Sequence, residues 1–290
     1  MSQRALYHQD LALPLTPAQL ARLALRSLHG ELVLYPKPGL VSLIDNGSHT
    51  DMTAATFVRS LFSLRHYFSE ISFAGMQALP FASLKRLAIA AEQRMLRATK
   101  GVNTHRGAIF SIGMLCAAIA CCSARRIALT PQAIRAALLN NWGEELARHT
   151  HVMLADSHGT RVAKQYAASG AREEAALAFP SVFEIALPRL QATLAAGRSW
   201  HEAQIDAFFA LVAHISDTNL YHRGGAAGAH FARMAAQDFL DAGATAQPDW
   251  RSQAVACHRL FVQHRLSPGG AADLLAATCL LQLCMHDSAC

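Results

Sequence analysis

Several signatures of common enzyme classes are missing from this chain. It has no GxxxxGK[ST] phosphate loop, no strand-led GxGxxG fingerprint and no GxSxG nucleophile elbow. The HExxH, HxxxH and CxxC spacings that are typical of zinc sites are also absent. These absences disfavour the common kinases, the nicotinamide dehydrogenases and a zinc enzyme.

Charged residues and strand-forming runs are scarce as well. Only 16% of the 290 residues are charged and 52% are hydrophobic, so the chain can bury a sizeable core and is not disordered. Ala and Leu dominate long stretches that lack Gly and Pro, whereas runs rich in Val, Ile, Thr and Tyr are few. The sequence therefore predicts an all-α fold, with residues 1–290 forming a single domain of about ten helices.

The N-terminus has no sustained apolar region of the kind that a secretory signal needs. The number of cysteines is odd, at seven, and most of them lie in apolar helical runs, which indicates a reducing compartment. The longest uncharged stretch, residues 108–124, is shorter than the roughly 20 residues of a membrane span. We expect a cytoplasmic protein without a membrane anchor.

Basic residues are in modest excess, with a formal net charge of +6. They form no compact cluster interleaved with aromatic residues, so nucleic acid is not the expected partner. The excess fits a polyanion such as a nucleotide, but composition alone favours a solvated positive surface.

Apolar periodicity, caps and breakers divide the chain into helices and loops. Thr16 with Pro17 begins the first helix, and Ser199 with Glu202 forms a capping box. Pro180 and Pro188 should break the helical run that contains them. The predicted helices cover residues 16–34, 51–67, 80–98, 106–123, 130–148, 156–168, 171–195, 200–216, 225–240, 249–264 and 270–285.

Polar residues gather in four segments at loops or helix starts, namely residues 36–52, 101–108, 217–225 and 266–275. Each has a plain structural interpretation, because Asp51, Thr104 and Ser267 are residue types that cap helices. Together they suggest more, since Lys37, Arg106 and Arg223 are each close to a Gly that lets backbone approach a ligand. The Ser-Pro-Gly-Gly stretch opens a helix, where exposed amides favour an anion. Convergence of the four segments would suit a polyphosphate.

Histidines and carboxylates in these segments are the candidate chemical groups. A lone His near an apolar helix is more often structural than catalytic, and this applies to His49, His105 and His222. Carboxylates suit hard cations, so Asp45, Asp51, Asp217 and Asp273 are candidates for holding Mg²⁺ that bridges to phosphate oxygens.

Taken together, the segments resemble a known family. PKPGLV (36–41) with NGSHTDM (46–52), VNTHRGAIFS (102–111), DTNLYHRGG (217–225) and LSPGGAADLLA (266–276) are similar, in order, to the sequence blocks of triphosphoribosyl-dephospho-CoA synthases. The match runs from about residue 20 to 285. Two positions depart from the family pattern: Ser42 stands where the citrate-lyase branch tends to carry an acid, and Arg106 stands where Lys is common.

The resemblance implies a reaction. ATP would give its triphosphoribosyl group to the 2′-hydroxyl of 3′-dephospho-CoA, with release of adenine. The product is a prosthetic-group precursor that a separate transferase loads onto an acyl-carrier subunit. The wording of the first segment favours the malonate-decarboxylase branch over the citrate-lyase branch.

The resemblance and the chemistry together suggest roles. Asp217 or Asp273 would be the base, and His105 or His222 would donate to the departing adenine. Lys37, Arg106 and Arg223 would hold phosphates, and Asp45 and Asp51 would bind Mg²⁺. The remaining substrate-binding candidates are Gly39, Asn103, Gly224, Ser267, Gly269 and Gly270.

Two other functions remain open on these residues. A helical N-glycosidase would use water in place of the CoA hydroxyl, and it would not need to bind dephospho-CoA. A non-enzymatic nucleotide-binding or scaffold protein would keep the fold without releasing adenine from ATP.

Overall fold

A computed structural model describes residues 14–152 and 170–287. Within these two ranges the chain is helical and contains no strand, so the all-α prediction is confirmed. The elements are α1 (Pro17–Val33), α2 (Ala54–Leu64), α3 (Tyr67–Met76), α4 (Phe81–Ala98), α5 (Arg106–Ala124), α6 (Pro131–Val152), α8 (Ala171–Ala176), η1 (Ser181–Ala186), α9 (Leu187–Ala195), α10 (Trp200–His214), α11 (Thr218–Asp241), η2 (Ala244–Ala246), α12 (Trp250–Gln263) and α13 (Gly269–Asp287).

Local sequence explains several helix starts. Thr16 forms a capping box with Gln19 ahead of α1, and Ser199 does the same with Glu202 ahead of α10. The run at 171–195 is divided around Pro180 and Pro188 into α8, the π-helical η1 and α9, as proline chemistry requires. The helix predicted over 156–168 lies outside the described residues.

The prediction around α2 and α3 was wrong in its boundaries. Thr53, rather than Asp51, caps α2, which ends at Leu64. A further helix, α3, follows over Tyr67–Met76 and was not predicted, because its aromatic and β-branched residues are weak helix formers. Packing overrides that weakness, since α3 lies against α5 so closely that a Cβ on Gly75 would be 2.3 Å from the carbonyl oxygen of Ala117.

The third polar segment is also different from the loop that the sequence suggested. Helix α11 begins at Thr218, well before the predicted start at residue 225. The chain kinks at Gly225, where φ is 62° and ψ is −161°, a conformation that only glycine adopts without strain. The glycine therefore separates two helical stretches of α11: the second agrees with the helix predicted over 225–240, and the first, from Thr218, was not predicted.

Helix α5 forms the centre of the core. It has a mean hydropathy of 2.0 over its most apolar stretch, and it is the one helix in the described ranges that is long and apolar enough to span a membrane. However, 83% of that stretch is buried by protein, with α3, α13 and α6 packed around it. The stretch is therefore a buried core helix, as the sequence predicted.

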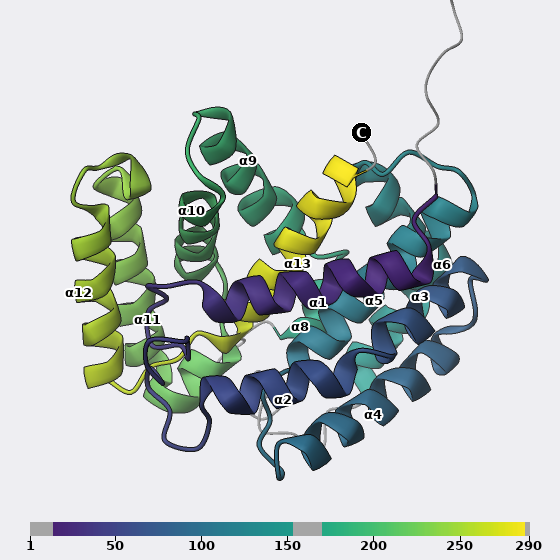
Figure 1. The fold of residues 1–290 in the computed structure, drawn as a ribbon, viewed down its shortest axis with the longest axis horizontal. Helices are drawn as coiled ribbons and strands as arrows, with labels where there is room; N and C mark the ends of the chain where they lie inside the picture. Colours follow the sequence, from purple (N-terminus) through teal and green to yellow (C-terminus); the bar gives the residue numbers. More distant parts are fainter. Residues whose placement is uncertain (1–13, 153–169, 288–290) are drawn as a thin grey trace, which may run out of the picture.

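Figure 1 shows how the other helices surround this core. Helix α1 (purple) crosses the middle of the view and packs on α13 (yellow). Helices α11 and α12 stand side by side at one end, and the loop that follows α1 folds against them. Buried residues from Leu15 to Cys284 belong to a single hydrophobic cluster.

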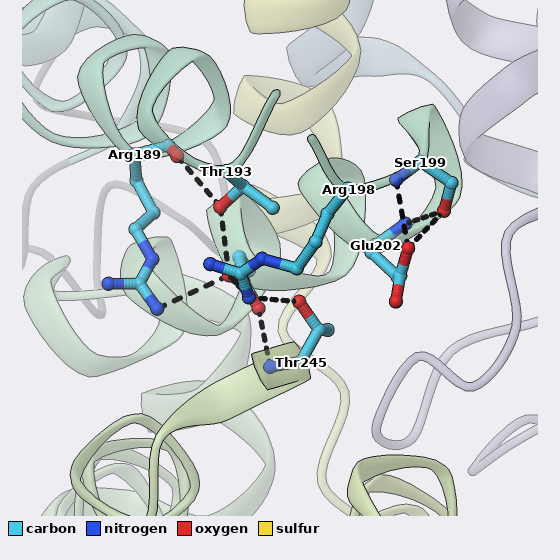
Figure 2. A network of polar contacts seen from close by, with 7 residues as sticks. Arg189, Thr193, Arg198, Ser199, Glu202 and Thr245 are labelled. Atoms are coloured by element: carbon cyan, nitrogen blue, oxygen red, sulfur yellow. Dashed lines mark hydrogen bonds and ion pairs between the residues drawn. The ribbon is translucent and has the colours of Figure 1, made fainter. Parts of the chain in front are cut away.

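A buried carboxylate ties α9, α10 and η2 together (Figure 2). Asp206 on α10 is fully buried and accepts hydrogen bonds from Thr193 at 2.8 Å and from the Thr245 amide at 3.0 Å. Arg189 and Arg198 donate to the same carboxylate at 3.2 and 3.3 Å. These donors satisfy the buried charge, so the network is structural.

Replacing Asp206 by Asn should lower the free energy of unfolding by about 1.5–3 kcal/mol, because the Asn amide keeps the shape but loses the charge-assisted bonds. Chemical denaturation measures the change. Turnover of the folded variant should stay at the parental level, since Asp206 lies outside the polar segments; a large loss of turnover would contradict the structural role.

Candidate active site

The four polar segments meet through direct contacts. The loop after α1 reaches the turn before α13, where Ser48 donates to the carbonyl oxygen of Leu266 at 2.6 Å and His49 Nε2 lies 2.8 Å from Ser267 Oγ. The start of α13 in turn contacts the starts of α11 and α5. The starts of α5, α11 and α13 therefore lie close together, and the positive ends of their helix dipoles favour an anionic ligand, although Asp217, Asp273 and Asn103 already accept from several of their amides.

Asp217 joins the starts of α11 and α13. Its Oδ1 accepts from the Asn219 amide at 2.8 Å, which caps α11, and its Oδ2 accepts from the Ala271 amide at 3.0 Å. The side chain also lies against Gly270, where a Cβ would be 3.0 Å from the Asp217 carboxyl carbon. Burial raises the pKa of Asp217, although the backbone donors oppose this. The residue is thus a cap and a link between two helices.

Asp273 is the most perturbed acid of the site. It lies in the first turns of α13 and accepts a hydrogen bond from the amide of Ala108 on α5. Burial raises its pKa well above the usual value, and the neighbouring carboxylates of Glu31 and Asp217 raise it further. Gly107 makes room for it, because a Cβ there would be 2.1 Å from Oδ2 of Asp273.

A buried ion pair lies beside these acids. The Lys37 ammonium has no exposed surface and pairs with Glu31 on the last turn of α1. Burial lowers the pKa of Lys37, while Glu31 acts in the opposite direction. In this structure Lys37 therefore points inward toward a carboxylate, whereas the sequence suggested a contact with phosphate.

His105 is buried at the start of α5, and its Nδ1 lies 2.6 Å from Ser60 Oγ on α2. Its Nε2 is buried and has no hydrogen-bond partner among the described residues. Burial, with the charge of Lys37 nearby, lowers the pKa of His105 to about 3. The imidazole is therefore neutral at physiological pH.

The loop that carries Lys37 is fastened to α12. His258 Nδ1 lies 2.9 Å from the Lys37 carbonyl oxygen, and its Nε2 lies 3.2 Å from Asp45 Oδ2. Gly39, with φ of 71°, passes so close to the turn after α12 that a Cβ would meet the Leu266 carbonyl oxygen at 2.0 Å. Ser42 is buried and accepts from the amide of Ile44 at 3.1 Å, so it shapes a turn in this loop.

Arg223 joins the first and third segments. It donates to the Ser48 carbonyl oxygen at 3.1 Å and contacts His49 Nδ1 at 3.0 Å. Asp51 lies 3.5 Å from the same nitrogen. The contact with the Arg223 guanidinium is the shorter of the two, and it requires a lone pair on His49 Nδ1. Burial and the charge of Arg223 also lower the pKa of His49. We therefore assign the imidazole as neutral.

The other predicted residues lie around this centre. Arg106 is exposed and pairs with Glu92 at 2.6 Å, and its amide donates to the Asn103 side chain at 3.1 Å. His105 occupies the N-cap position of α5, so Thr104 is not its cap. His222 is exposed on α11 next to Arg223. Close contacts explain two glycines: a Cβ on Gly224 would be 2.6 Å from Leu266 Cδ2, and one on Gly269 would be 3.0 Å from the Asn219 side-chain amide.

The described residues include no group of three or more His, Cys, Asp or Glu side chains placed to hold a metal ion. Asp45 is engaged by His258 and by the Gly47 amide at 2.8 Å, and Asp51 is mostly exposed beside His49. These carboxylates do not form a ligand set without help from a bound ligand's oxygens.

Three residues of the site were not identified from the sequence. Glu31 is one acid in an otherwise ordinary amphipathic helix, Ser60 is a common residue of α2, and His258 is a lone histidine of α12. Only Glu31 could have been identified from the sequence pattern. It falls on the apolar face of α1, where a buried acid needs a partner.

Comparison with known proteins identifies the family of this chain. Residues 17–289 match the family model of the ATP:dephospho-CoA triphosphoribosyl transferases (CitG). A probable 2-(5''-triphosphoribosyl)-3'-dephosphocoenzyme-A synthase of Acinetobacter calcoaceticus is 39% identical over 91% of this chain and 90% of its own length. The 2-(5''-triphosphoribosyl)-3'-dephosphocoenzyme-A synthase of Pectobacterium atrosepticum is 38% identical over 87% and 84%.

A similarly named protein of Pseudomonas fluorescens (strain Pf0-1) is 39% identical over 93% of this chain and 92% of its own length. No solved structure gives a significant match. Because the family model covers nearly all of the chain and the relatives align over most of both lengths, this chain belongs to the ATP:dephospho-CoA triphosphoribosyl transferase family.

Proposed function

We propose that this enzyme transfers the triphosphoribosyl group of ATP to the 2′-hydroxyl of 3′-dephospho-CoA and releases adenine. The family match and the names of the relatives support this reaction. The structural observation that carries it is the position of Asp273, a carboxyl group that accepts from the Ala108 amide where the starts of α5, α11 and α13 meet. Such a site combines a base with a positive environment for phosphates.

In the proposed mechanism, the 2′-hydroxyl oxygen attacks C1 of the ATP ribose from the side opposite adenine. The bond from C1 to N9 breaks, and adenine leaves with the electron pair through an oxocarbenium-like transition state. The hydroxyl proton passes to a carboxyl group in its ionised form, and the departing adenine takes up one proton from solvent, so that the charges balance. Asp273 suits this role better than Asp217, because both Asp217 oxygens already accept backbone hydrogen bonds and Asp273 is held by one amide.

The triphosphate would be held by the helix N-termini and by cations at the edge of the site. Arg106 and Arg223 have the exposed surface that such contacts need. Lys37 would not contact the phosphates directly, because its ammonium is buried and paired with Glu31. Its positive charge would act on them at longer range. His222 stays a candidate for contacts with adenine or phosphate from α11.

Replacing Arg106 by Ala should weaken ATP binding by about ten- to a hundredfold, the equivalent of one charge-assisted contact of roughly 1.5–3 kcal/mol. Isothermal titration with ATP measures the affinity. Arg65→Ala is the matched control, since Arg65 is exposed on the surface and donates to the Phe62 carbonyl oxygen. Equal affinities of the two variants would remove Arg106 from the phosphate site.

Mg²⁺ is proposed to accompany ATP. Because the described residues supply no complete ligand set, the triphosphate oxygens and water would provide most of the ligands, with Asp45 or Asp51 contributing at most one or two. The ion would neutralise phosphate charge. Mg²⁺ titration of Asp45→Asn and Asp51→Asn variants tests the two carboxylates.

We further propose that the enzyme is cytoplasmic and passes its product to a transferase that acts on an acyl-carrier subunit. The sequence of the first polar segment, residues 36–52, favours the malonate-decarboxylase branch.

The test is incubation with ATP and 3′-dephospho-CoA, followed by mass analysis. The expected products are free adenine and the triphosphoribosyl adduct. Adenine with free triphosphoribose would instead indicate an N-glycosidase, and unchanged ATP would indicate a nucleotide-binding protein without this activity.

A further inference from the structure

One polar atom of the site has no role in the mechanism so far. Nε2 of His105 is buried and unpaired within the described part of the chain, although its ring is firmly held. A buried polar atom without a partner is unfavourable, so it is retained where a ligand or water supplies the missing bond. Phe57 packs edge-on to the same ring, with centroids 5.1 Å apart.

The other ring nitrogen is the end of a hydrogen-bond chain. Thr104 Oγ1 donates to Ser60 Oγ at 2.8 Å, so the Ser60 oxygen already receives one proton from Thr104. Ser60 Oγ lies 2.6 Å from Nδ1 of His105, and we assign the single hydroxyl proton of Ser60 to this contact because Thr104 already donates to the same oxygen. Nδ1 is thereby the acceptor, and the ring proton is on Nε2, the unpaired nitrogen.

We propose that Ser60 is a positioning residue, which holds His105 in the tautomer that presents an Nε2–H donor to a ring nitrogen of the departing adenine. The proposal rests on the proposed function for its substrate, but not for its tautomer. Adenine is favoured over phosphate because the donor is neutral and lies beside an aromatic ring. The burial that keeps the imidazole uncharged makes it a hydrogen-bond donor that retains its proton.

Such a donor acts on the leaving group. As the bond between C1 and N9 breaks, negative charge develops on adenine, and a preorganised N–H stabilises it more in the transition state than in the ground state. Loss of the donor should therefore lower kcat and leave KM for ATP nearly unchanged.

The first test needs no activity. The ¹⁵N NMR spectrum of histidine-labelled protein should show His105 with a protonated Nε2 and an unprotonated Nδ1, with His105→Gln used for assignment. Ser60→Ala should give a mixed or reversed tautomer, and Thr104→Val should shift the populations the same way. An Nε2–H tautomer that survives in both variants would overturn the proposal.

The second test is adenine release under steady-state conditions. Ser60→Ala should lose about 10- to 100-fold in kcat, the equivalent of one hydrogen bond to developing charge. His105→Gln, which keeps an amide N–H near the Nε2 position, should retain more activity than His105→Ala. In the His105→Ala background, Ser60→Ala should cause no further loss, because Ser60 acts through the ring.

Ser63→Ala is the matched control, since Ser63 lies one turn along α2 and donates to the Ser60 carbonyl oxygen. Parental kcat in Ser60→Ala, or independent losses in the double variant, would overturn the positioning role. If the parent enzyme releases no adenine, the proposed function fails, and the NMR result alone decides the tautomer.

Discussion

Asparagine in place of Asp273 should lower turnover by about 10²–10⁴-fold, because the amide cannot accept the hydroxyl proton of the attacking group. The same substitution should raise the melting temperature at neutral pH. Burial and the nearby carboxylates of Glu31 and Asp217 both make a negative charge on Asp273 unfavourable in the folded state. Asn carries no charge, so it avoids this cost, and its carbonyl oxygen still accepts from the Ala108 amide. Steady-state kinetics and thermal unfolding of one variant check both parts.

The pH dependence follows from the direction of the shift. The folded-state pKa of Asp273 lies above its unfolded value, so the folded state holds this proton more tightly. The contribution of this proton to the free energy of unfolding is present below the ordinary pKa of an Asp, about 4. It is lost as pH rises toward and through the pKa that Asp273 has in the folded state. The advantage of Asp273→Asn in melting temperature should therefore grow with pH across that window.

Two other buried acids serve as controls. Asp217→Asn keeps an acceptor for the α11 cap, so it should cost less turnover than Asp273→Asn if Asp273 is the base. Asp206→Asn should lose stability without losing turnover. Near-parental turnover of a folded Asp273→Asn enzyme would remove Asp273 from catalysis and leave it as a partner of the α5 amides.

Replacing Glu31 by Ala should lower the free energy of unfolding by about 3–5 kcal/mol, because it leaves the Lys37 charge buried and unpaired. Adding Lys37→Met should recover much of this stability, since the stranded charge is then gone. Denaturant titrations of the parent, both single variants and the double variant form a complete cycle.

The Glu31→Ala deficit should shrink as pH rises. Burial already lowers the pKa of Lys37, and removal of Glu31 takes away the charge that opposes this shift. A lysine whose folded pKa is depressed destabilises the fold at pH values below it, and the penalty fades as pH rises toward the unfolded value of about 10.4. A double variant no more stable than Glu31→Ala, or a deficit independent of pH, would show that the pair is not the source of the loss.

Much of the fold follows from local chemistry. The capping boxes at Thr16 and Ser199 and the breaks near Pro180 and Pro188 depend on contacts between residues a few positions apart, so they were predictable. The α3 helix and the early start of α11 were not, because packing against α5 and the bend at Gly225 override weak local preferences.

The sequence by itself determined the helical class, the four polar segments and the family, because composition, caps and ordered motifs are properties of short stretches. Only the tertiary structure decided which groups meet. The pairing of Lys37 with Glu31, the contact of Asp273 with α5 and the link from Ser60 to His105 join different helices or a helix and a loop. Their protonation also depends on burial, which exists only once the helices have packed.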